Sequence, residues 1–285
     1  MDIKAFKMNG LGNDFVIIDN RQKITNLTKD QIIKICDRNF IGCDQLILIE
    51  NDKSADANLK FFNSDGGESG ACGNGTRCVA DYIMRELGCN EIAIEIGTSI
   101  LHSWRSVENN NHISVDMGSA YLDWADVPLA SEADTLSVDL GPPAPVPAVC
   151  HSVGNPHAVL FVDDAEAIDL DNVGPPLEHH PLFPERANIS FAHQIGPNKY
   201  RMRVWERGVG ITSACGSGAC AVGVAVHRAG RGSRNTEIIM DGGSVFIDWQ
   251  DDGTVGGRVI MRGPVGYVFD GILSTDLDGL LRAGT

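Results

Sequence analysis

The sequence predicts a mixed α+β protein made of two domains with the same fold, and two observations carry this prediction. A Cys-centred stretch, FFNSDGGESGACGNG from Phe61, recurs without a gap in a degenerate form as VWERGVGITSACGSG from Val204. Its cysteines, Cys72 and Cys215, are 143 residues apart (215 − 72), which is half of the 285-residue chain. Most of the chain consists of short β-rich runs separated by Gly, Asn and Asp. A period this long indicates duplication of a whole domain rather than a solenoid.

Two further pairs of polar residues keep the register of the repeat. Asn13 of GNDF matches Asn155 of GNPH at an offset of 142, and Gln45 matches Asn188 at an offset of 143. A chance match between two glycine-rich loops would not extend to these distant positions. The sequence therefore predicts two pseudosymmetric domains from an internal duplication.

Strands are expected to dominate each repeat, with few helices between them. Helical signals occur after Thr28 in TKDQIIKICDRN and directly after each motif cysteine, in GNGTRCVADYIMRELG and GSGACAVGVAVHRAG. Gly88 is expected to end the first of the two motif helices. The strands are expected at FVIID, QLILIEN, NLKFFN, IAIEIG, ISVDMG, HAVLFVDD, YRMRVWER, SVFIDWQ and GRVIMRG. Each repeat is thus predicted to be a set of strands with one largely buried helix.

The domain boundary is expected after Gly118, where a linker-like segment leads into Pro-rich sequence. The first domain is then 1–118 together with the C-terminal tail 265–285, and the second domain is 119–264. The segment GSAY at 118–121 loosely echoes GPVGY at 263–267. We therefore expect the terminal segments to cross between the domains.

Composition excludes several classes of partner. Hydrophobic residues make up 43% of the chain and charged residues 21%, as in ordinary globular proteins, and the net charge is −15. This charge disfavours binding to nucleic acid or to an anionic membrane, because both need clustered Lys and Arg. Without a signal-peptide pattern or an apolar run long enough to span a membrane, we expect a cytoplasmic protein. The eight cysteines are then expected to be free thiols.

A cysteine followed by Gly-rich sequence and a helix lies where unpaired backbone N–H groups and the positive end of the helix dipole converge. Such a position is expected to lower the pKa of the Cys72 and Cys215 thiols and to bind a carboxylate. Inversion of a carbon next to a carboxylate requires a base on one face and an acid on the other, which two matched thiols can supply. The sequence contains no P-loop, no strand-linked GxGxxG and no lysine in either motif for a Schiff base. We therefore expect no cofactor.

Structural roles are the alternative to catalysis for the cysteines of this chain. Cys36, Cys43, Cys89 and Cys150, and also the helical Cys78 and Cys220, are expected to be core residues. A zinc site made of the two Cys pairs is disfavoured, because five and four residues separate the partners and run into helices, whereas structural zinc ligands usually lie about two to four residues apart on a turn. A disulfide joining the two motif cysteines is interpreted as oxidative inactivation. A noncatalytic protein that binds an amino acid or zinc remains the alternative from another class.

The blocks MNGLGNDFVIID, FFNSDGGESGACGNGTRC, VGNPHAV, RANISFA and WERGVGITSACGSGACAVGVA resemble the successive signatures of the diaminopimelate epimerase family. They span residues 8 to about 225 in the family's order. The resemblance implies a rolled β-sheet around a central helix in each domain, an active site in the interdomain cleft and a homodimer. It also implies epimerisation of L,L- and meso-diaminopimelate in lysine and peptidoglycan biosynthesis, without pyridoxal phosphate or metal.

The resemblance assigns roles position by position. Cys72 and Cys215 resemble the acid-base pair, Glu206 an acid that recognises the amino group and supports catalysis, and His157 an accessory residue near the thiols. Arg207 resembles the partner of the distal carboxylate. The remaining substrate-binding positions are Asn13, Gln45, Asn63, Asn155 and Asn188, with the backbone amides of Gly73, Asn74, Gly216 and Ser217 around the reacting carboxylate.

The chain departs from the family pattern at a few positions. Ile211 stands where the family commonly has Glu, and Ser217 where it commonly has Thr, so we expect altered charge near Cys215. Proline and hydroxyproline racemases also use two cysteines but do not need a cation for a distal carboxylate, so Arg207 disfavours them. Isomerases of the phenazine-biosynthesis type are expected to carry a carboxylate in place of the first cysteine, which Cys72 disfavours.

Overall fold

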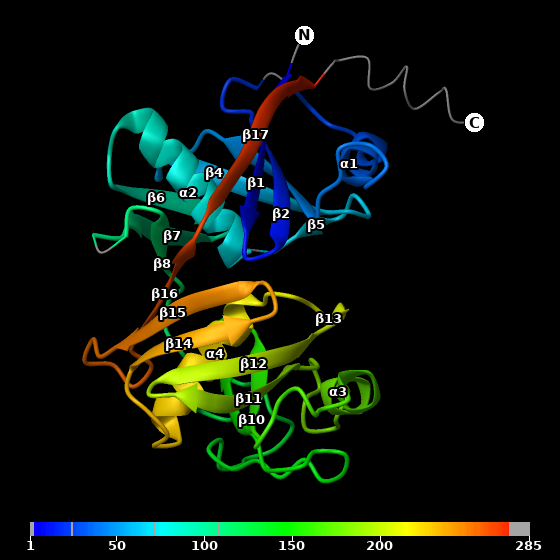
Figure 1. Cartoon of the computed structure of the whole chain (residues 1–285), viewed down its shortest axis with the longest axis vertical. Helices are drawn as coiled ribbons and strands as arrows, with labels where there is room; N and C mark the ends of the chain where they lie inside the picture. The colour runs from blue at the N-terminus through cyan, green and yellow to red at the C-terminus, as the bar shows by residue number, and fades with distance from the viewer. Residues whose placement is uncertain (1–2, 24, 71, 108, 274–285) are drawn as a thin grey trace. The chain divides into compact units, whose positions relative to one another are not determined.

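The computed structural model describes residues 3–23, 25–70, 72–107 and 109–273. Its residues form two compact units, which Figure 1 shows in the colours of the chain. The first comprises the described parts of Met1–Val115 and Gly263–Thr285, and the second comprises Asp116–Arg262. Of the tail 265–285 that the sequence assigns to the first domain, residues 274–285 lie outside the described residues.

The first unit is a mixed sheet with two helices. Strand β1 pairs antiparallel with both β2 and β17, β2 pairs parallel with β3, and β3 pairs antiparallel with β4. β4 in turn pairs antiparallel with β5 and parallel with β6, and antiparallel β7 and β8 follow. The elements are β1 (Ile3–Gly10), β2 (Asn13–Asp19), α1 (Lys29–Cys36), β3 (Gln45–Glu50), β4 (Ala57–Asn63), β5 (Glu68–Ser69), α2 (Gly73–Leu87), β6 (Glu91–Ile96), β7 (Ser99–Arg105), β8 (His112–Asp116) and β17 (Gly266–Leu273).

The second unit repeats this plan. β9 and β10 pair antiparallel, β10 and β11 pair parallel, and β11 and β12 pair antiparallel. β12 pairs antiparallel with β13 and parallel with β14, and β15 and β16 follow antiparallel. The elements are β9 (Val149–Ser152), β10 (Pro156–Phe161), α3 (Leu170–Glu178), β11 (Asn188–Gly196), β12 (Lys199–Glu206), β13 (Gly210–Ile211), α4 (Gly216–Arg228), β14 (Asn235–Met240), β15 (Gly243–Gln250) and β16 (Arg258–Pro264). The predicted duplication is confirmed: β1 to β8 and β9 to β16 pair in the same order and directions.

Segments distant in sequence complete each sheet. The C-terminal strand β17 lies beside the N-terminal strand β1, with Ile3 opposite Leu273 (Figure 1). In the second unit, Tyr121 forms an antiparallel bridge to Ser152 of β9. The loosely similar segments 118–121 and 263–267 thus lead into equivalent pairings.

The three predicted helices are present, and their ends follow the expected signals. Thr28 caps α1 through a capping box with Gln31, and Gly88 ends α2 in the left-handed conformation at φ 67°. Helix α3 was not predicted, because Pro175 and Pro176 interrupt its sequence.

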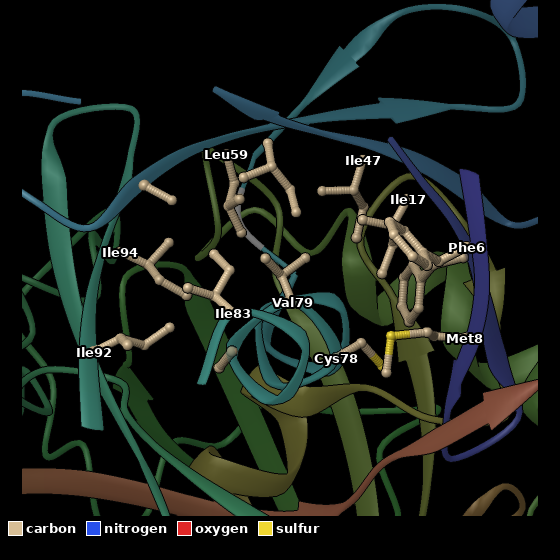
Figure 2. Packing of buried hydrophobic residues seen from close by; sticks show 14 of the residues in the cluster. Phe6, Met8, Ile17, Ile47, Leu59, Cys78, Val79, Ile83, Ile92 and Ile94 are labelled. Atoms are coloured by element: carbon tan, nitrogen blue, oxygen red, sulfur yellow. The ribbon is translucent and has the colours of Figure 1, made fainter. Parts of the chain in front are cut away.

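Each central helix lies in the core of its own unit. In the first unit, Cys78, Val79 and Ile83 of α2 pack against strand residues such as Ile47 and Leu59 (Figure 2). A Cβ on Gly75 would lie 2.8 Å from both Ile47 Cδ1 and Phe61 Cε1, so glycine is needed at this close approach.

The cysteines predicted to be core residues are buried, with one exception. Cys36, Cys43, Cys78, Cys150 and Cys220 are at most 3% exposed. The prediction for Cys89 is wrong: it lies just beyond the end of α2 and is half-buried at the edge of the core. Among the helices of the described residues, none is long and apolar enough to cross a membrane.

Candidate active site

The two motif cysteines occupy the same structural position in their units. Cys72 is the N-cap of α2 at φ −118° and ψ 109°, and Cys215 is the N-cap of α4 at φ −108° and ψ 108°. The prediction that each begins a helix is confirmed. Each thiol therefore lies beside the first N–H groups of its helix, where the dipole favours an anion.

In the first unit, Cys72 contacts a side-chain amide. Its Sγ donates to Oδ1 of Asn13 at 3.5 Å, and Nδ2 of Asn13 donates to Oδ2 of Asp44 at 2.8 Å. Gly73 and Asn74, in the first turn of α2, are both buried. Oδ1 of Asn74 accepts from Arg77 at 2.9 Å. The structure thus brings together four of the predicted residues of this unit.

Gln45 and Asn63 form a second polar group in the first unit. They are directly opposite each other on β3 and β4, and Nε2 of Gln45 donates to Asn63 Oδ1 and to Ser69 Oγ, each at 3.0 Å. Oε1 of Gln45 is buried and accepts no hydrogen bond from the described part of the chain. A buried acceptor of this kind suits an N–H donor of a ligand.

In the second unit, Cys215 is 3% exposed and surrounded by polar groups. Its Sγ accepts from the Gly218 N–H at 3.3 Å and lies 3.6 Å from Ser217 Oγ. Burial, followed by the charge of Glu206, raises the pKa of the Cys215 thiol well above its ordinary value, against the smaller lowering effects of Ser217 and Gly218. The expectation of a lowered pKa is therefore wrong for this thiol, because desolvation outweighs the helix N-terminus.

Glu206 ends β12 and contacts both Thr212 and Cys215. It accepts a hydrogen bond from the Thr212 hydroxyl, and a second hydrogen bond joins it to the Cys215 thiol. Burial raises the pKa of Glu206, and these two hydrogen bonds oppose the rise. Ile211, at the position of the missing family carboxylate, is 42% exposed on β13. The negative charge beside Cys215 is therefore that of Glu206.

His157 is completely buried and lies beside two of the predicted amides. Its Nε2 is 2.9 Å from Asn155 Oδ1, and Asn155 Nδ2 donates to Ser217 Oγ at 3.4 Å. Burial, and to a smaller extent the charge of Arg207, lowers the pKa of His157 to about 3. His157 is therefore neutral near neutral pH.

Asn188 connects His157 to Arg207. It is directly opposite His157 in the parallel pairing of β10 and β11, and its Nδ2 donates to the Pro156 carbonyl at 3.1 Å. Its Oδ1 accepts the backbone N–H of Arg207 at 3.0 Å. The Arg207 guanidinium donates to the Glu185 carbonyl at 3.1 Å, a bond that uses one of its five N–H donors.

Sequence reasoning missed the residues that hold the predicted ones. Asp44 and Ser69 bond to Asn13 and Gln45, and Thr212 bonds to Glu206. Each is close in sequence to a motif residue, but no local pattern distinguished it from a surface residue. The described residues contain no cluster of three or more His, Cys, Asp or Glu side chains that could hold a metal ion.

The match to a known protein family falls in two segments, as the duplication does. The family model described as diaminopimelate epimerase matches residues 5–122 and 149–268. The chain is 48% identical to the diaminopimelate epimerase of Pelagibacter ubique, over 93% of this chain and 96% of the relative. It is 49% identical to that of Acidiphilium cryptum, over 94% and 95%, respectively.

Solved structures of low sequence identity share the fold. A phenazine biosynthesis protein of the PhzF family from Bacillus anthracis superposes with a TM-score of 0.67 at 16% identity, covering 96% of this chain and 99% of that one. A probable proline racemase from Agrobacterium radiobacter also has a TM-score of 0.67, at 12% identity, covering 96% and 93%. The two-domain fold class predicted from the sequence is confirmed, and so is the resemblance drawn from the motifs. The chain belongs to the diaminopimelate epimerase family.

Proposed function

We propose that this isomerase interconverts L,L- and meso-diaminopimelate without a cofactor, using Cys72 and Cys215 as an acid-base pair. One observation carries the proposal: in a member of this family, both units place a cysteine in the same extended conformation at the N-terminus of a buried helix. The reaction proposed here belongs to the biosynthesis of lysine and peptidoglycan.

The chemistry follows from these two positions. One sulfur, as thiolate, removes the α-proton, and the other, as thiol, delivers a proton to the opposite face of the carbon. The backbone N–H groups of Gly73 and Asn74 and those of Gly216 and Ser217 surround the reacting carboxylate. Charge that develops on that carboxylate is stabilised by donors that are already in place.

The raised pKa of Cys215 requires activation by the substrate. In the free enzyme, burial and the Glu206 carboxylate both disfavour the Cys215 thiolate. Binding of the α-ammonium group beside Glu206 neutralises this charge, which lowers the pKa of Cys215 when substrate is present. Substrate binding and base formation are then coupled.

The polar residues suit a zwitterion with two carboxylates and two ammonium groups. Side-chain amides offer donors and acceptors without net charge, which fits Asn13, Gln45, Asn63, Asn155 and Asn188 as substrate-binding residues. Arg207 pairs with the distal carboxylate, for which a guanidinium is geometrically suited. Neutral His157 is an accessory residue that holds Asn155. A racemase acting on proline would have no distal carboxylate for Arg207.

The test is an exchange experiment in D2O. Reduced, metal-free protein is incubated with L,L-diaminopimelate without pyridoxal phosphate, and chiral chromatography with mass spectrometry follows the product. Meso product carrying one solvent deuterium at the α-carbon supports the proposal. Without exchange in protein whose thiols are verified as reduced, the proposal fails and a binding protein or a racemase takes its place.

We further propose a cytoplasmic homodimer that binds neither nucleic acid nor membrane. The net charge of −15 supports the exclusion of polyanionic partners. Strand β17 supports the dimer, because Tyr267, Val268, Phe269 and Ile272 are all more than half exposed. Sedimentation equilibrium of the wild type and of Ile272→Glu tests it: a monomeric wild type contradicts the dimer.

A further inference from the structure

The side-chain amide of Asn13 is held at both ends. Its carbonyl oxygen accepts from Cys72 Sγ at 3.5 Å, and its NH2 group donates to Asp44 Oδ2 at 2.8 Å. An ionised carboxylate only accepts hydrogen bonds, so Asp44 can bind only the NH2 end of the amide. The contact with Asp44 therefore decides which end of Asn13 faces the thiol.

Asp44 is itself fixed by a cluster of charges within the first unit. Its Oδ1 accepts from Arg38 Nη2 at 2.6 Å, and its Oδ2 also accepts the backbone N–H of Asp14 at 2.9 Å. Arg38 bonds both carboxylate oxygens of Asp14 at 2.8 Å, and Lys7 pairs with Asp14 and donates to the Gly42 carbonyl. Burial would raise the pKa of Asp14, but hydrogen bonds from Arg38 and Lys7 lower it to about 2. Asp14 therefore stays ionised near neutral pH.

The second unit provides an internal comparison. Asp44 precedes Gln45 as Ala187 precedes the matching Asn188, so the second unit has a buried methyl group in place of this carboxylate. There the matching amide, Asn155, has other partners: its oxygen lies 2.9 Å from His157 Nε2, and its NH2 group donates to Ser217 Oγ at 3.4 Å. The carbonyl of Asn13 faces the thiol, whereas the NH2 group of Asn155 faces the residue beside the thiol.

We propose that Asp44 is a positioning residue that holds the Asn13 carbonyl on the Cys72 thiol, and so keeps the proton on Cys72 in the free enzyme. A carbonyl oxygen accepts from S–H but gives no donor to a thiolate, so this orientation stabilises the protonated form. The inference rests on the proposed two-thiol function. It also explains why the surroundings of Cys72 and Cys215 differ in the free enzyme.

The test compares Asp44→Ala and Asp44→Asn with wild type, and Glu91→Gln serves as the control. Glu91 is exposed in the same unit, so its variant removes one charge away from the site. Alkylation of Cys72 by iodoacetamide near neutral pH is followed at the peptide level by mass spectrometry, alongside kcat/KM and Tm. In Asp44→Ala the amide can turn its NH2 group toward the sulfur, which stabilises the thiolate. We expect Cys72 alkylation to become about fivefold faster and kcat/KM to fall about tenfold, the scale of one hydrogen bond.

Asp44→Asn separates positioning from folding, because it retains a side-chain oxygen that accepts from Asn13 while losing the Arg38 ion pair. We expect its Cys72 alkylation rate to stay within about twofold of wild type, since the amide contact survives. A lower Tm without a change in Cys72 reactivity in Asp44→Ala would overturn the inference, and so would slower alkylation. If Asp44→Ala does not fold, Asp44→Ser replaces it in the comparison. Equal acceleration of Cys72 alkylation in Asp44→Asn and Asp44→Ser then also contradicts the inference. Failure of the two-thiol function itself appears separately, as full epimerase activity in Cys72→Ala.

Discussion

The Glu206 carboxylate controls the Cys215 thiol, and Glu206→Gln tests this control. The substitution keeps the shape of the side chain and an oxygen that accepts from S–H, but it removes the negative charge. In the structure this charge is the second-largest cause, after burial, of the raised pKa of Cys215. Its loss must lower the pKa of Cys215, because a thiolate no longer forms beside a carboxylate.

The magnitude follows from the contact between the two groups. Two unit charges in contact interact by at most about 4 kcal/mol at an effective dielectric constant of about 20, which sets the upper limit for this pair. Burial of Cys215 is unchanged by the substitution, so its thiol stays harder to ionise than an exposed one. If removing the charge lowers the pKa of Cys215 by at least about one unit, which corresponds to about 1.4 kcal/mol, the thiolate fraction near neutral pH rises at least about tenfold. We expect alkylation of Cys215 to accelerate by the same factor.

The assay is peptide-resolved alkylation of substrate-free protein, with epimerase turnover measured in parallel. Epimerisation by Glu206→Gln should fall about 100-fold, because the variant loses the anion proposed to bind the ammonium group, and a hydrogen bond to a charged group contributes about 1.5–3 kcal/mol. Glu132→Gln, which removes an exposed carboxylate from the same unit, should change neither rate. Cys215 alkylation that is unchanged or slower in Glu206→Gln refutes the assigned electrostatic coupling.

Three further predictions concern the surroundings of the thiols. Thr212→Val removes the hydroxyl that donates to Glu206, so the pKa of Glu206 rises further, and kcat/KM measured across the pH range should lose its low-pH activity. Gly75→Ala forces a methyl group to 2.8 Å from Ile47 Cδ1, and urea unfolding should show a loss of about 1–3 kcal/mol, typical of overpacking. The pKa of His157 is lowered to about 3 in the folded chain, so between about pH 6.5 and pH 3 the unfolded chain binds a proton that the folded chain does not. The free energy of unfolding, measured with urea, should therefore fall as the pH drops through this range. In His157→Gln it should fall less steeply.

The sequence predicted the duplicated fold because the duplication left its traces in local chemistry. Helix α2 ends at Gly88, a position that follows from a capping rule acting within one turn, whereas Cys72 at its N-terminus makes no side-chain capping hydrogen bond. Helix α3 violates such rules, since it contains two prolines and packs Gly174 against Trp205, where a Cβ would lie 2.4 Å from the indole. Its existence depends on this tertiary contact, which no local pattern contains.

Candidate site residues could be picked out from the sequence where the residue type itself suggests chemistry, and not where a residue acts through another residue. Cys72 and Cys215 stand out as a repeated nucleophile at a helix start. The raised pKa of Cys215 did not follow from that position, because its burial depends on strands far away in sequence. Asp44 was missed for the same reason: its bond to Asn13 joins residues 31 positions apart.

Among the positions at which the two halves differ, several bear charge around the candidate site. In the repeat alignment, Asn63 corresponds to Glu206, Ser64 to Arg207 and Asp44 to Ala187. In the proposed mechanism, an enzyme that inverts one centre of diaminopimelate uses two equivalent thiols, because the proton leaves one face and arrives at the other. It needs only one cation for the single distal carboxylate and only one anion for the reacting ammonium group. In this proposal, duplication accounts for the pair of thiols, and divergence of the residues around them accounts for recognition of a substrate whose two ends are not treated alike.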